Sequence, residues 1–123
     1  MKTLTKAEEQ IMQILWDLKR AMVKDIMDRL QNSRQPYTTI SSVVRILEKK
    51  GYVSHKAYGK THEYFPLISK AEYRRHKFRG LLTGYFDNSI ESMVSFLVKE
   101  ERISPEEIEG LAKMISQEPE NTS

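Results

Sequence analysis

The chain has 123 residues, which is enough for one domain with an appendage or one elongated domain but not for a separate catalytic domain. It has no cysteine, so disulfides and thiolate sites are excluded. Since no apolar run approaches the roughly 20 residues of a membrane span and the first residues do not resemble a secretory signal, we expect a cytoplasmic protein without a membrane partner. The net charge of +3 combines 17 Lys or Arg against 8 Asp or Glu in residues 1–86 with 3 against 9 in residues 87–123, which favours a polyanionic partner for the basic part.

Two helices are predicted in the first part of the chain. Residues 5–18 form the first, because Thr5 and Glu8 have the spacing of a capping box and apolar residues follow at helical spacing on one face. Residues 23–31 form the second, with apolar residues at i, i+3, i+4 and i+7. The composition of residues 32–36, NSRQP, indicates a turn before the next element.

A third helix is predicted between Pro36 and Gly51. We expect Thr38 to cap this helix, Pro36 to prevent its backward extension and Gly51 to end it with a positive φ. An apolar stripe on one face consists of Ile40, Val43, Val44 and Leu47. The opposite face is small, hydroxylated and basic, and it carries Thr38, Ser42, Arg45 and Lys49, with Thr39 and Ser41 at its flanks. Such a face on its own is typical of an ordinary solvated helix, and only the neighbouring elements favour a binding surface.

After Gly51 the apolar period changes from 3.6 to 2, which predicts a β-hairpin. Its strands are residues 52–56 and 61–65, joined around Tyr58 and Gly59 and stopped by Pro66. Three helices followed by a basic hairpin is the order of a winged helix-turn-helix domain, in which the third helix enters the DNA major groove and the hairpin lies along the backbone or minor groove. The predicted fold is therefore mainly α with a small β-hairpin.

The rest of the chain predicts three more helices. One follows Ser69, and start signals for the others are Asn88 with Glu91, and Ser104 with Pro105 and Glu107. Three helices in about 50 residues are too few to bury their apolar faces alone, so we expect a homodimer. We expect a DNA-binding domain at 1–67, a helical dimerisation domain at 68–117 and a disordered tail at 118–123. The expected dimer contacts are Phe78, Leu82, Phe86, Met93, Val94, Leu97, Ile108, Leu111 and Ile115.

Four segments in order resemble the penicillinase-repressor family of the BlaI/MecI type. They are LTKAEEQIMQILW, YTTISSVVRILEKKGYV, YGKTHEYFPLIS and ISPEEIEGLAKMI. The resemblance implies a homodimeric transcriptional repressor whose winged helix binds a palindromic operator and whose C-terminal helices intertwine between two chains. Some members are cleaved at an Asn-Phe bond, where this chain has Phe96 and Leu97, and a copper-responsive branch carries C-terminal cysteines that are absent here.

Candidate DNA contacts fall into two groups. Arg45 is the strongest candidate for base recognition, because its guanidinium can donate hydrogen bonds to guanine O6 and N7 at the same time. The alternatives for Arg45 are a phosphate contact or an ion pair with Glu48. The expected base contacts are Thr38, Thr39, Ser41, Ser42 and Arg45. The expected contacts to the backbone of double-stranded operator DNA are Lys24, Lys49, Lys50, Lys56, Tyr58 and Lys60.

His55 and His62 raise the question of a metal site. A hairpin turning about Tyr58 and Gly59 would place them opposite each other, and a register slipped by one would place His55 opposite Glu63. Two histidines are fewer ligands than a zinc site uses, so we expect no metal and no cofactor.

Catalytic constellations are missing, so we expect no enzyme. The alternatives to a repressor are a winged-helix protein-interaction module and a metal- or small-molecule-responsive sensor.

Overall fold

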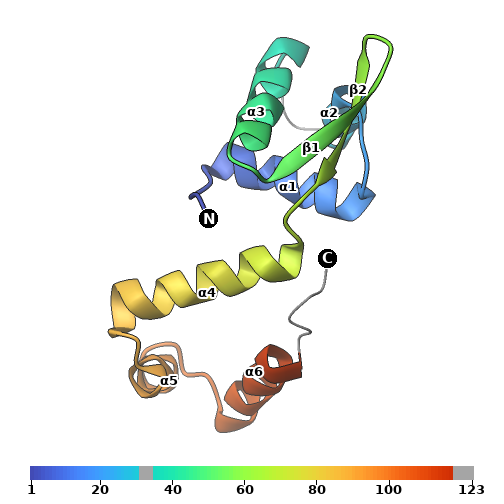
Figure 1. The fold of residues 1–123 in the computed structure, drawn as a ribbon. Coiled ribbons are helices and arrows are strands. Elements are labelled where there is room, and N and C mark those ends of the chain that lie inside the picture. The colour runs from blue at the N-terminus through green and yellow to red at the C-terminus, as the bar shows by residue number, and fades with distance from the viewer. Residues whose placement is uncertain (31–34, 118–123) are drawn as a thin grey trace. The chain divides into compact units, whose positions relative to one another are not determined.

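The structure, a computed structural model, describes residues 1–30 and 35–117, and the chain divides into two compact units after Lys70 (Figure 1). The first unit, Met1–Lys70, contains three helices and a two-stranded antiparallel sheet. Its elements are α1 (Lys6–Leu18), α2 (Val23–Arg29), α3 (Tyr37–Lys49), β1 (Val53–Tyr58) and β2 (Thr61–Pro66). α4 (Lys70–Phe86) starts at the boundary, and α5 (Ile90–Lys99) and α6 (Pro105–Gln117) follow. The predicted order of helices and hairpin is confirmed.

Helix α1 begins with the predicted capping box. The Thr5 backbone N–H donates to Glu8 Oε1 over 2.9 Å, and the Glu8 backbone N–H donates to Thr5 Oγ1 over 3.2 Å. Two backbone donors at the helix start are satisfied in this way, which stabilises the end by about 1 kcal/mol. Helix α2 is shorter than predicted, because the N–H of Leu30 already closes its last turn on Ile26 and Met27; Gln31 lies outside the described residues.

Helix α3 begins one residue before the position predicted for its cap. The prediction that Thr38 is the N-cap is wrong: Pro36 takes that position with an extended ψ of 161°, and its carbonyl accepts from the N–H groups of Thr39 and Ile40. Thr38 therefore lies inside the first turn. At the other end Gly51 has φ +86°, as predicted for the residue that ends the helix.

The core of the first unit lies between its three helices and the start of the hairpin. Ile40, Val44 and Leu47 are buried as predicted, whereas Val43 is half-buried. Other fully buried side chains are Met12, Leu15, Ile26, Tyr52 and Val53. Truncating one of the large aliphatic side chains to Ala is expected to cost about 2–5 kcal/mol, so this stripe fixes which face of α3 remains at the surface.

The hairpin has a different register from the two considered in the sequence. Tyr58 pairs with Thr61, so the loop is Gly59 and Lys60, with φ +63° at Gly59, as in the glycine-first turns that suit two-residue hairpins. His55 consequently pairs with Tyr64, so the two pairings considered for His55, with His62 and with Glu63, are both wrong.

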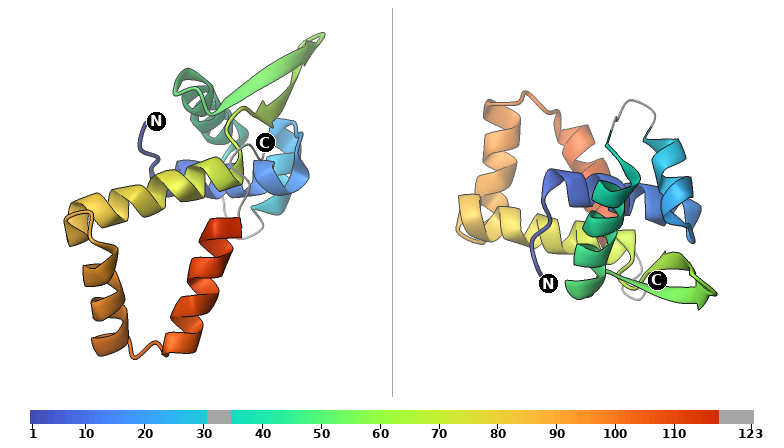
Figure 2. Two further views of the ribbon diagram at one scale, coloured as in Figure 1. Left: turned by 60° about the horizontal axis from the view of Figure 1, so that its bottom comes forward. Right: turned by 90° about the horizontal axis from the view of Figure 1, so that it is seen from above.

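Two contacts attach the hairpin and the residues after it to the helices. Ala21 and Tyr64 exchange backbone hydrogen bonds of 2.9 and 2.7 Å, which adds the α1–α2 connection to the edge of β2. The Trp16 indole N–H donates to the carbonyl of Ile68 over 2.8 Å. The hairpin projects from the end of α3 (Figure 2), and the first unit extends a few residues past the expected boundary at 67.

The second unit begins two of its helices with serine caps. The predicted start at Asn88 is wrong: Asp87 and Asn88 have φ of 49° and 61°, and the cap is Ser89, whose hydroxyl accepts from the Ser92 N–H over 3.0 Å. The predicted box at α6 is confirmed, with both Ser104–Glu107 bonds at 3.2 Å and a proline at the first helical position.

The helices of the second unit leave much apolar surface accessible. Tyr85 is 80% exposed, and no side chain of α5 is buried, although Phe86 and Phe96 meet edge to face at 5.6 Å. The expected dimer residues whose side chains are described are all half-buried: Phe78, Leu82, Phe86, Met93, Val94, Leu97 and Ile108. Leu111 and Ile115 belong to α6, but their side chains lie outside the described residues, as does the expected disordered tail at 118–123. Within residues 1–30 and 35–117, no helix is long and apolar enough to cross a membrane.

Candidate nucleic-acid interface

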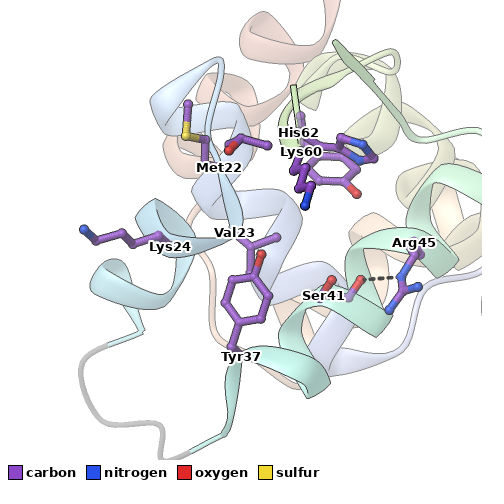
Figure 3. A pocket seen from close by; sticks show the side chains of 10 residues that line it. Met22, Val23, Lys24, Tyr37, Ser41, Arg45, Lys60 and His62 are labelled. Carbon is purple, nitrogen blue, oxygen red and sulfur yellow. Dashed lines mark hydrogen bonds between the residues drawn. The ribbon is translucent and has the colours of Figure 1, made fainter. Parts of the chain in front are cut away.

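A groove of about 510 Å³ lies between the start of α2, one side of α3 and the hairpin (Figure 3). Three cations line it from three elements: Lys24 from α2, Arg45 from α3 and Lys60 from the hairpin loop. The other lining residues are Met22, Val23, Tyr37, Ser41, Thr61, His62 and Tyr64. None of these lining residues is acidic, so the groove has the charge that an anionic strand requires.

The hydroxylated face of α3 lies at the surface beside this groove. Thr38, Thr39 and Ser42 are exposed, and Ser41 is half-buried at the groove wall. The Ser42 hydroxyl donates to the carbonyl of Thr38 over 2.9 Å, so its proton is used within the helix. With the proton so placed, Ser42 can accept a hydrogen bond from a base amino group but cannot donate to a phosphate oxygen.

Arg45 is exposed on the same side of α3, with its guanidinium only weakly held. Its Nε donates to the carbonyl of Ser41 over 3.5 Å, which is the upper limit for such a bond. No ion pair to Arg45 is seen among the described residues, and the alternative pairing with Glu48 is not formed because that carboxylate bonds His55. Most of the guanidinium donors therefore remain available to a ligand.

The expected backbone-contact residues do not all lie together. Lys24 and Lys60 line the groove, and Lys49 is exposed at the end of α3. Lys56 and Tyr58 lie on the exposed part of β1, with the ammonium 5.4 Å from the centroid of the ring. These residues leave a basic strip along the hairpin and the end of α3.

Lys50 differs from the other lysines because it is bonded inside the first unit. Its Nζ donates to Glu8 Oε1 over 2.6 Å and to the carbonyl of Thr3 over 3.0 Å. Burial opposes ionisation of Glu8, but the bonds from Lys50 and Thr5 outweigh that effect and lower the pKa of Glu8 below its ordinary value. Lys50 thus holds the end of α3 to the start of the chain, and its expected role as a phosphate contact loses its main support.

Aromatic and acidic side chains join the hairpin to α3. His55 Nδ1 lies 2.7 Å from Glu48 Oε2, and the His55 ring stacks on His62 with 4.1 Å between centroids. The histidines share one face of the hairpin because His62 is diagonal to His55 in the observed register.

Burial, and then the nearby Glu48, raises the pKa of Tyr64, so its phenol stays protonated. Among the described residues no group of three His, Cys, Asp or Glu side chains could hold a metal ion.

Six lining residues of this groove were not among the sequence candidates for DNA contact: Met22, Val23, Tyr37, Thr61, His62 and Tyr64. Tyr37 and His62 show what the sequence could and could not have indicated. Tyr37 stands four residues before Ser41 and eight before Arg45, so helical spacing alone could have placed it on their side of α3. His62 could be placed only once the hairpin register was known, because a shift of the strand pairing by one residue would put its side chain on the opposite face.

Comparisons with known proteins agree along most of the chain. Residues 4–117 match the family model described as penicillinase repressor. The chain is 25% identical over 114 residues to the methicillin resistance regulatory protein MecI of Mammaliicoccus sciuri, which is 92% of this chain and 93% of that protein. It is 24% identical over 115 residues to the penicillinase repressor of Bacillus licheniformis, which is 93% of this chain and 90% of that protein. The solution structure of the DNA binding domain of the repressor BlaI matches 59% of this chain and 94% of its own, with a TM-score of 0.52 and 26% identity.

Proposed function

This chain belongs to the penicillinase repressor family, and we propose that it is a DNA-binding transcriptional repressor that reads its operator with α3. The single observation that carries the proposal is the groove lined by Lys24, Arg45 and Lys60 beside the exposed hydroxyl face of α3. The likeness to the DNA binding domain of BlaI supports DNA as the partner of this chain. A regulator of this kind is not an enzyme, and its place of action is the cytoplasm, where its DNA lies.

The proposed interface has two groups of residues, one that contacts bases and one that contacts phosphates. Thr38, Thr39, Ser41, Ser42 and Arg45 on α3 face the base edges in the major groove, where Arg45 supplies the two-pronged donor that guanine accepts. Lys24, Lys49, Lys56, Tyr58 and Lys60 contact phosphates on either side and fix the register of the protein on the duplex. Lys50 is left out of this set because Glu8 and Thr3 already bond it.

The second part of the proposal is a homodimer on a palindromic operator. Residues 1–67 bind DNA and residues 68–117 hold the two chains together, since the half-buried apolar side chains from Phe78 to Ile108 gain cover only from another surface. A second copy of the chain is the occupant with matching shape, because a twofold interface pairs identical patches. Twofold symmetry in the protein then requires twofold symmetry in the operator.

Selection of bound fragments from genomic DNA of the source organism tests the proposal directly. The full-length protein is expected to enrich a short set of fragments that share one inverted repeat, because two α3 helices related by a twofold axis read the same half-site. Enrichment of fragments without a common sequence would contradict sequence-specific repression. Enrichment of a sequence that is not an inverted repeat would contradict the dimer part alone.

A further inference from the structure

Tyr37 is an exposed aromatic residue at the start of the proposed recognition helix. It is the first residue of α3, and its side chain is 56% exposed. Tyr37, Ser41 and Arg45 recur at intervals of four, so they lie on one side of the helix. Figure 3 shows the Tyr37 ring extending from α3 toward Val23 on α2, within the groove.

The surroundings of the Tyr37 hydroxyl suit a group that only accepts hydrogen bonds and carries negative charge. Lys24, Arg45 and Lys60 line the same groove, and the first turn of α3 contains no acidic residue. The Tyr37 hydroxyl has no hydrogen-bond partner among the described residues, so its proton is available. A phosphodiester oxygen is such an acceptor, and hydroxyl donors are common partners of DNA phosphates.

We propose that Tyr37 is a DNA contact that donates its hydroxyl to a phosphodiester oxygen of the strand lying between α2, α3 and the hairpin. The proposal rests on the proposed DNA-binding function and adds to it a contact of a different chemical kind. A neutral donor strengthens binding without displacing a counterion, whereas a lysine at the same backbone displaces one. The two kinds of contact therefore differ in how their loss changes the salt dependence of binding.

The test is Tyr37→Phe in the full-length chain, which removes one hydroxyl and keeps the ring. Binding is measured by fluorescence anisotropy on the selected operator and on a scrambled duplex of equal length, at several KCl concentrations. We expect binding about tenfold weaker on both duplexes, since a hydrogen bond to a charged oxygen is lost. The slope of log K against log salt is expected to stay at the wild-type value, while Lys60→Ala makes it smaller by about 1.

Tyr85→Phe is the matched control, because Tyr85 is also exposed but belongs to the second unit. This control is expected to bind as the wild type does, and the unfolding temperature of Tyr37→Phe is expected to be unchanged because no internal bond is lost. Wild-type affinity in Tyr37→Phe, alongside the altered slope in Lys60→Ala, would overturn the Tyr37 contact and leave the proposed function intact. Weakening on the operator only would point to a base edge and would also overturn the phosphate contact. Absence of salt-dependent binding in the wild type would overturn both.

Discussion

The imidazole of His55 on β1 is bonded to the carboxylate of Glu48 on α3, with 2.7 Å between Nδ1 and Oε2. The same ring stacks on His62 of β2 at an interplanar angle of 12°. One side chain thus links both strands of the hairpin to the proposed recognition helix. Since the groove lies between α3 and the hairpin, this link helps to set its width.

His55→Ala is expected to lower the free energy of unfolding by about 0.5–1.5 kcal/mol, because one hydrogen bond at a half-exposed site is lost. Glu48→Gln, His55→Ala and the double variant, compared by urea unfolding, isolate the coupling between the two side chains. Less than additive loss in the double variant is the expected outcome. Strictly additive losses would mean that the pair does not hold the hairpin to α3.

Arg45→Ala is expected to cost about 1–3 kcal/mol of binding at one operator base pair and to relax the preference there. Binding to a panel of operators with single base-pair changes measures this loss. Arg45→Lys is the matched variant, because it keeps the charge but lacks the fork that holds guanine. An unchanged sequence preference in Arg45→Ala would show that the guanidinium contacts phosphate rather than a base.

Lys50→Met is expected to lower the free energy of unfolding by about 1–3 kcal/mol, because the Glu8 carboxylate is left buried without its partner. Since the folded state lowers the pKa of Glu8, its contribution is present above the ordinary value of 4.5 and is lost as pH falls through the folded value. When unfolding is measured from pH 7 to pH 3, the free energy of unfolding is therefore expected to decrease less in Lys50→Met than in the wild type. Lys49→Met is the neighbouring control, because Lys49 is exposed; equal stability of the two variants would contradict the assignment.

The oligomer is expected to depend on the second unit. Sedimentation of the full chain is expected to give twice its mass of 14.4 kDa, whereas a chain ending at Lys70 gives a monomer. The shortened chain retains the whole first unit, including the bond from Trp16 to Ile68. A monomeric full-length chain at micromolar concentration would contradict the proposed homodimer.

The sequence was sufficient to predict the elements whose signals are local. The Thr5–Glu8 and Ser104–Glu107 boxes and the positive φ of Gly51 were predicted correctly, because each depends on residues within one turn. The cap of α3 was missed because the carbonyl of Pro36 closes the first turn without a side-chain acceptor. A hydroxyl residue nearby is therefore not proof of a cap.

The groove itself could not be predicted from the sequence, because it depends on contacts between distant residues. Lys49 and Lys50 are adjacent and chemically identical, yet only the fold brings Glu8 to Lys50 and leaves Lys49 exposed. The hairpin register likewise depends on which residues form the turn, and a loop at Gly59 and Lys60 shifts His55 by two residues relative to His62. Candidate residues on α3 were found because helical spacing fixes their face.

The salt dependence of operator binding tests the central claim most directly. The wild-type chain is expected to bind its operator with a linear fall of log K against log salt, and Lys24→Ala and Lys60→Ala are each expected to reduce that slope by about 1 on operator and scrambled duplex alike. Lys6→Ala is the control, because Lys6 is exposed on α1 and does not line the groove. Unchanged slopes in both groove variants, or an equal change in Lys6→Ala, would contradict the proposal that DNA lies in the groove between α2, α3 and the hairpin.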